Sequence, residues 1–236
     1  MELPSFATDA KKSVYSELLT VCRDQIDQSP IFWNWVSAGF LTGPTLKKIF
    51  FLKEVLDRTT NLSAPIYEFG SGLGTKVFAL LNIQSISSSP IRPIVAFDSL
   101  LGYSDSGMLS LEKSQENVKN NYKSMNKILK QLYQTDFDLI EFNVGELPES
   151  LSKLENHHVA SICFIDVQSG DLTASLLKWA LEIIQVGGII VIEGVNSPFF
   201  PKVTKSLAKF EIPRNCRILQ LDWEYTLILE KMDSFV

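Results

Sequence analysis

The chain has 236 residues, 45% of them hydrophobic and 21% charged, which is the composition of an ordinary globular protein with one large domain. Its net charge of −5, without a long basic run, argues against a nucleic-acid partner, and no apolar run reaches the roughly eighteen residues that span a membrane. The three cysteines lack CxxC spacing and the two histidines are adjacent, which argues against a zinc site or a histidine-based triad and favours a reduced, cytoplasmic protein.

The first predicted element is an amphipathic helix over residues 9–29, where apolar side chains recur at helical spacing. No basic segment followed by an apolar one precedes it, so no export signal is expected. The aromatic stretch at 31–36 either packs against this helix or forms a lid over a substrate, and Trp33 and Trp35 in it are candidates for a homo-oligomer face. We therefore divide the chain into an N-terminal segment, 1–44, and a main domain, 45–236.

A glycine-rich turn follows the next predicted helix, over 45–56. Residues 66–75, IYEFGSGLGT, combine an apolar run, an acid and alternating glycines, which is typical of a strand, a tight loop and a helix. Dinucleotide loops space their glycines G-x-G-x-x-G, and P-loops end in Gly-Lys-Ser/Thr, so neither phosphate site fits. Glu68 would repel phosphate but suits the cationic sulfonium of S-adenosylmethionine. A plain tight turn is the alternative interpretation.

Acidic residues follow the later predicted strands: Asp98 after 91–97, Glu146 beyond 138–142, Asp166 after 160–165, and Glu193 after 189–192. An acid at the position of Asp98 holds ribose hydroxyls in folds of this kind, although a turn or cap role is the alternative. Glu146 is either an acceptor for an adenine amine or a surface acid. Asp166 ends a continuous apolar strand of the kind that is buried on both faces.

Helices are predicted at 110–133, 172–184 and 201–209, with Gly187-Gly188 as the stop of the second, and the last strands lie near 216–221 and 224–230. This order predicts an α/β fold with a mostly parallel sheet, helices on both faces and an antiparallel C-terminal strand pair. The loops at the carboxyl ends of the strands are then the expected place for the chemistry.

Several short motifs follow one another in an order that is more specific than any one of them: E-x-G-x-G-x-G at 68–74, AFDSLLG at 96–102, Gly145-Glu146, FID at 164–166, and Gly187-Gly188 before a strand with Glu193. Over roughly residues 45–230, the chain resembles the macrocin-type O-methyltransferases. These are class I enzymes that use S-adenosylmethionine, often with magnesium, and many methylate sugar hydroxyls of natural products. The resemblance implies a Rossmann-like seven-stranded sheet, an S-adenosylmethionine cofactor and a small-molecule methyl acceptor.

The resemblance also implies which residues hold the cofactor: Glu68, Gly70, Ser71, Gly72, Gly74, Asp98, Ser99, Gly145, Glu146 and Asp166. Asp166 is in addition a candidate base or substrate anchor that Glu193 assists, with a cap or packing role as the alternative. The family pattern D-x-D-x-Y here has Gln168 at its second acid, and Gly194 stands where a second acid follows Glu193. Because magnesium prefers carboxylate oxygens, we expect little or no metal dependence.

Two other functions are left open. The missing acids would suit a catalytically degenerate protein that binds S-adenosylmethionine or serves as a scaffold. A nicotinamide-dependent oxidoreductase is disfavoured by the early third glycine and by Glu68.

Overall fold

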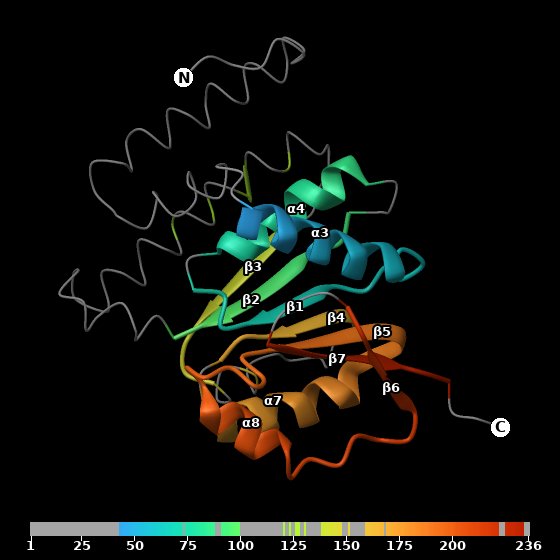
Figure 1. Cartoon of the computed structure of the whole chain (residues 1–236). Coiled ribbons are helices and arrows are strands. Elements are labelled where there is room, and N and C mark those ends of the chain that lie inside the picture. Colours follow the sequence, from blue (N-terminus) through green and yellow to red (C-terminus); the bar gives the residue numbers. More distant parts are fainter. Residues whose placement is uncertain are drawn as a thin grey trace.

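Figure 1 shows the computed structural model of the chain, which describes residues 43–72, 74–87, 91–99, 138–147, 159–167, 169–221 and 225–233, and also 120, 123, 126, 127, 130 and 151. The helix predicted at 9–29, the aromatic stretch at 31–36 and Gln168 lie outside the described residues. The division into 1–44 and 45–236 therefore stays a prediction.

The described residues form helices on either side of one sheet. The elements are α3 (Gly43–Arg58), β1 (Ile66–Phe69), α4 (Thr75–Ile86), β2 (Ile94–Asp98), β3 (Ile140–Val144), β4 (Ala160–Ile165), α7 (Gly170–Ile183), β5 (Ile184–Glu193), α8 (Pro201–Leu207), β6 (Cys216–Leu219) and β7 (Thr226–Lys231). Within the predicted helix 110–133, the residues that the structure describes are helical. No helix in the described ranges is long and apolar enough to cross a membrane.

The seven strands form one sheet in the order β3-β2-β1-β4-β5-β7-β6. β1, β2, β3, β4 and β5 pair in parallel, and β7 pairs antiparallel with both β5 and β6. The predicted fold class is confirmed, including the antiparallel strand pair at the C-terminal side. Because β1 and β4 are neighbours at the centre, the loops after them meet at the carboxyl edge of the sheet.

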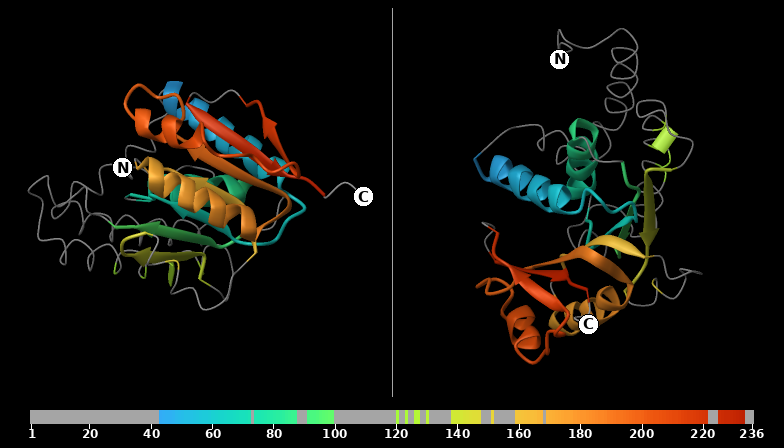
Figure 2. Two further views of the ribbon diagram at one scale, coloured as in Figure 1. Left: turned by 90° about the horizontal axis from the view of Figure 1, so that it is seen from below. Right: turned by 90° about the vertical axis from the view of Figure 1, so that its right-hand side faces the viewer.

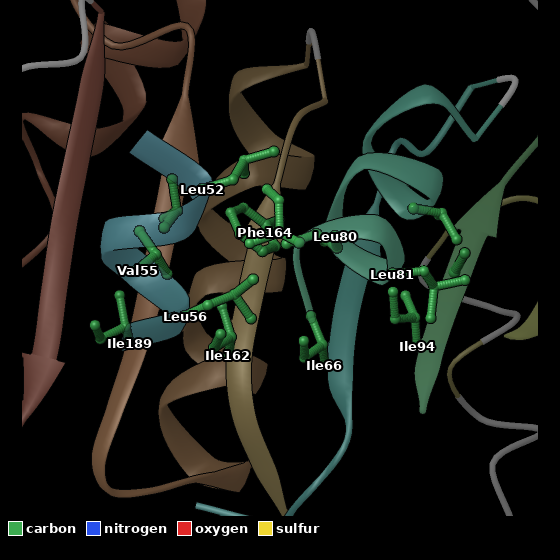
Figure 3. Close-up of a cluster of buried hydrophobic side chains, with 14 of the residues drawn as sticks. Leu52, Val55, Leu56, Ile66, Leu80, Leu81, Ile94, Ile162, Phe164 and Ile189 are labelled. Carbon is green, nitrogen blue, oxygen red and sulfur yellow. The ribbon is translucent and has the colours of Figure 1, made fainter. Parts of the chain in front are cut away.

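Side chains of each strand alternate between two hydrophobic cores, because successive residues point to opposite faces. On one face α3 and α4 pack over Ile66, Ile162 and Phe164, as Figure 3 shows. On the other face α7 covers Tyr67 and Phe69, with α8 beside it. Figure 2 shows the same division from two further directions, with the sheet between the two helical layers. This alternation fixes which strand-end residues face α4.

β5 is longer than predicted at its start. The prediction makes Gly187-Gly188 a helix stop before a strand at 189–192, but α7 already ends at Ile183 and Ile184 is extended. The two glycines lie inside β5, where Gly187 has φ 77° and the pairing with β4 shifts register between Ala160 and Ile162. The glycines thus serve an irregularity in a strand, not the end of a helix.

Candidate cofactor and catalytic site

The glycine-rich loop connects β1 to α4 at the carboxyl edge of the sheet. Gly70, Gly72 and Gly74 have φ of 81°, 54° and 80°, a region that side chains disfavour. Gly70 has a second constraint, because a Cβ there would lie 2.1 Å from the backbone oxygen of Asp166. The loop therefore lies directly against the end of β4.

Asp98 ties the glycine loop to the end of β2. Its Oδ2 accepts a hydrogen bond from the backbone N–H of Gly72 at 2.6 Å, and its backbone oxygen accepts one from Gly145 at 3.1 Å. The N–H groups of Gly70 and Ser71 both donate to the oxygen of Phe97, at 2.9 and 3.2 Å. The ends of β1, β2 and β3 are thus joined around Asp98.

Lys76, the second residue of α4, points into a cluster of three carboxyl groups. Its Nζ lies 2.5 Å from Oε1 of Glu193, 3.3 Å from Oδ2 of Asp166 and 3.6 Å from Oε1 of Glu68. The ammonium also lies 5.3 Å from the centre of the Phe164 ring. The side chains of Lys76 and Glu68 are only 3% and 1% exposed, whereas that of Asp166 is 43% exposed. Asp166 is therefore the member of the cluster that faces solvent.

Burial and the acids compete in setting the protonation of this cluster. Burial raises the pKa of Glu68 to about 7, although Lys76 acts to lower it. Burial also opposes ionisation of Glu193, but the Lys76 ammonium brings the pKa of Glu193 below its usual value. The pKa of Lys76 is raised, because the acids, Glu193 first, outweigh the effect of burial. Both shifts favour a charged Lys76 beside an ionised Glu193.

Sequence comparisons find no relatives for this chain: no family model and no curated protein matches it.

Comparison with solved structures does find matches. The apo structure of CalS11, a TDP-rhamnose 3'-O-methyltransferase of calicheamicin biosynthesis, has a TM-score of 0.63 and 13% identity, over 98% of this chain and 99% of that chain. The O-methyltransferase NovP has a TM-score of 0.54 and 14% identity, over 79% and 80%. SAH-bound PaMTH1 from Podospora anserina has a TM-score of 0.55 and 13% identity, over 98% and 100%. This chain has the Rossmann-like methyltransferase fold. At such identities the likeness is one of fold.

The methyltransferase fold brings most of the predicted site residues to one edge of the sheet. The glycine loop, Asp98 and Gly145 are linked by the hydrogen bonds given above, and Asp166 meets the loop at Gly70. Ser99 and Glu146 follow the ends of β2 and β3 at the same edge, and Glu146 is exposed. Glu68 lies behind the loop against Lys76, not at the mouth of a crevice. The roles of these residues toward a cofactor stay predictions.

The acids at this edge do not fit a divalent metal ion. Magnesium needs oxygen ligands at about 2.0–2.1 Å in octahedral geometry, but the acids that converge here surround the Nζ of Lys76. Among the residues that the structure describes, no group of three or more His, Cys, Asp or Glu side chains is arranged to hold a metal. We therefore assign no step of the chemistry to magnesium.

Lys76 is the residue that sequence reasoning missed. A lysine in the first turn of a helix is normally a solvated surface residue. The alternation of side chains along the strands is the signal that could have found it. Each of the three acids lies two residues after a core residue on the face that α4 covers, and so points to the same face: Glu68 after Ile66, Asp166 after Phe164, and Glu193 after Val191. A helix that packs over three same-face acids brings a cation of its first turn among them.

Proposed function

We propose that this protein is an S-adenosylmethionine-dependent methyltransferase that methylates a hydroxyl group of a small molecule. The proposal rests on the arrangement of loops and acids at the carboxyl edge of the sheet. There a glycine loop tight against β4 and an acid at the tip of β2 lie beside a cluster of carboxyl groups at the ends of β1, β4 and β5. The methyltransferases of the same fold named above support the reaction class.

The charge of the site supports a cationic cofactor. Three carboxyl groups surround one ammonium, so the acidic groups are in excess near the glycine loop. A pyrophosphate would be repelled there, whereas a sulfonium is attracted. Asp98 stands where ribose hydroxyls are held in folds of this kind, and its carboxylate also fixes the loop through Gly72. A cofactor that combines adenosine with a positive sulfur meets both conditions.

Methyl transfer to a hydroxyl is an in-line displacement. A bond forms between the acceptor oxygen and the methyl carbon while the carbon–sulfur bond breaks, and its electron pair stays on sulfur to give S-adenosylhomocysteine. The hydroxyl proton must leave, and Asp166 is our proposed acceptor because it is the exposed carboxyl group of the cluster. Glu193 accepts a hydrogen bond from Lys76 and assists by fixing that ammonium.

The acceptor class that we propose is taken from the solved structures of the same fold. CalS11 is described as a TDP-rhamnose 3'-O-methyltransferase, and it matches this chain over nearly its whole length. A sugar hydroxyl, or a hydroxyl of a comparable natural product, is therefore the first acceptor to test. Within 43–233, no described feature contradicts a monomer or a homo-oligomer, and the role of Trp33 and Trp35 in assembly stays a prediction.

Cofactor binding tests the proposal most directly. Titration calorimetry should show saturable binding of both S-adenosylmethionine and S-adenosylhomocysteine. Asp98→Asn should weaken both by about tenfold to a hundredfold, because hydrogen bonds to a carboxylate are lost. Glu182→Gln, which changes an exposed acid of α7, is the matched control and should bind like wild type. Binding of NADH in place of both ligands would overturn the proposal.

A degenerate cofactor-binding protein is the second candidate, favoured by the commitment of Asp166 and Glu193 to Lys76. A transfer assay with labelled S-adenosylmethionine and a panel of nucleotide-sugar and phenolic hydroxyls separates the two. Transfer that Asp166→Asn reduces, with cofactor affinity unchanged, supports the enzyme. Undiminished transfer removes Asp166 from the mechanism. Tight cofactor binding without transfer to any acceptor supports the degenerate protein.

A further inference from the structure

The buried ammonium of Lys76 lies among the three acids of the cluster and is shielded from solvent. We infer that Lys76 is a built-in cation that fills the space among the acids, excludes a divalent metal ion from it and, as a positioning residue, holds Asp166 and Glu193 for methyl transfer. The exclusion of metal follows from the geometry alone, whereas the positioning role rests on the proposed function.

Lys76 cannot act by touching a substrate, because its side chain is 3% exposed. It acts through its neighbours. An ammonium carries three N–H donors, and this one has Glu193, Asp166 and Glu68 on three sides. Asp166, at 43% exposure, connects the buried charge to solvent. Because the ammonium holds the Asp166 carboxylate, this carboxylate has fewer orientations available before a substrate binds. It is therefore better aligned to meet a bound hydroxyl group.

A metal ion and this ammonium exclude each other. The Oε1 of Glu193 and the Oδ2 of Asp166 lie 2.5 and 3.3 Å from Nζ, so a metal bonded to both oxygens would need the space of Nζ itself. Two cations that close would also repel strongly in a buried site. While Lys76 is in place, a magnesium ion therefore cannot bridge these two oxygens.

The carboxyl group of Glu68 provides a second observation about this cluster of acids. Oε2 of Glu68 is buried and has no hydrogen-bond partner in the described part of the chain. It belongs to the carboxyl group whose Oε1 lies 3.6 Å from the ammonium, on the face of the sheet that α4 covers. Without the ammonium, the three acids would lose the cation that lies among them, and the partly buried Lys48, which also acts on Glu68 and Glu193, would remain. A small divalent cation that enters the vacated space could then bind their oxygens.

Binding of Mn²⁺, followed by the loss of its free-ion EPR signal on addition of MnCl₂, tests the exclusion. Wild type should show no saturable binding, with or without S-adenosylhomocysteine. Lys76→Met should gain one saturable site and should rise in melting temperature with Mn²⁺. Lys178→Met, which changes an exposed lysine of α7, should behave like wild type. Asp166→Asn in the Lys76→Met background should remove the gained site.

Two results would overturn the exclusion: saturable Mn²⁺ binding by wild type that Asp166→Asn abolishes, or a folded Lys76→Met protein that gains no site. The wild-type titration decides even where Lys76→Met fails to fold. Lys76→Gln, whose side chain is one atom shorter and carries no charge, is then the second variant and should also gain the site.

Steady-state kinetics test the positioning role. Lys76→Met should lower kcat by about tenfold or more, with a much smaller change in the KM for S-adenosylmethionine. Mn²⁺ or Mg²⁺ should restore part of kcat in the variant but leave EDTA-treated wild type unchanged. An unchanged kcat, or a loss that neither ion relieves, contradicts the role. If wild type transfers no methyl group at all, the proposed function fails while the Mn²⁺ titrations still decide the exclusion.

Discussion

At the scale of single residues, Glu68 shows how a fold can bury a carboxyl group and so disfavour its ionisation. The side chain is 1% exposed, and the nearer of the two cations that act on it, Lys76, is shared with Asp166 and Glu193, while Lys48 acts more weakly. Burial therefore wins, and the pKa of Glu68 rises to about 7. An acid whose pKa is raised in the folded state binds its proton more tightly there than in the unfolded chain, so ionisation of Glu68 works against the fold.

Glu68→Gln should make stability less dependent on pH. The contribution of Glu68 is fully present below its unfolded pKa, near 4.5, and is lost as the pH rises through about 7. Between pH 5 and 8, wild type should lose up to about 3 kcal/mol relative to the variant in its free energy of unfolding. Urea unfolding at several pH values measures this, with Glu182→Gln as the control. Parallel curves for wild type and Glu68→Gln would contradict the assignment.

Two glycines with similar positive φ values make it possible to separate the cost of backbone strain from the cost of a steric clash. Gly70 and Gly187 have φ of 81° and 77°, but a Cβ at Gly70 would meet the backbone of Asp166 at 2.1 Å, whereas nothing lies within 4 Å at Gly187. Gly187→Ala should cost about 1–2 kcal/mol from φ alone. Gly70→Ala should cost about 3 kcal/mol or more, because the loop must also move.

Chemical denaturation measures both costs, and calorimetry shows whether cofactor binding follows. We expect only Gly70→Ala to lose affinity for S-adenosylhomocysteine. Equal losses of stability at the two positions would mean that the loop yields freely at the end of β4.

At the scale of elements, the two edges of the sheet each enclose a buried cation. At the carboxyl edge, Lys76 of α4 meets acids. At the opposite edge, Arg92 lies just before β2 and donates to the backbone oxygen and hydroxyl of Thr59, after α3, and to the hydroxyl of Ser161 in β4. With these neutral partners, burial lowers the pKa of Arg92 to about 10. We therefore interpret Arg92 as a structural link, whereas the acids around Lys76 belong to the proposed active site.

The contact between α7 and α8 positions the loop that follows Glu193. Gly170, the first residue of α7, has no room for a side chain, because a Cβ would lie 2.3 Å from the backbone oxygen of Lys202. Gly170→Ala should lower the free energy of unfolding by about 2–3 kcal/mol through displacement of α8, despite the better helix propensity of alanine. Ser175→Ala, on the exposed side of α7, should change it by less than about 0.5 kcal/mol. Thermal unfolding compares the two, and a neutral Gly170→Ala would show that α8 adjusts without cost.

At the scale of the whole molecule, the hydrophobic pattern of the sequence was enough to predict the sheet but not the full set of residues at the candidate site. Buried strands such as β4 read directly from continuous apolar runs, and acids at strand ends placed Asp98, Asp166 and Glu193 at one edge. Gly187-Gly188 was misassigned because a glycine pair after a helix resembles a stop signal, while its use in a bulged strand depends on pairing with β4. Lys76 was missed because two of the acids around it, Asp166 and Glu193, are distant in sequence and meet it only in the folded chain.

The position of β7 has a consequence for synthesis. Although it follows β6 in the chain, β7 lies between β5 and β6 and pairs with both. While a ribosome is still making residues 226–231, β5 has an open flank with unpaired backbone groups, and β6 has no neighbour to dock on. In a nascent chain of this protein, the sheet therefore closes only after β7 has been made, and until then β5 keeps an unpaired edge.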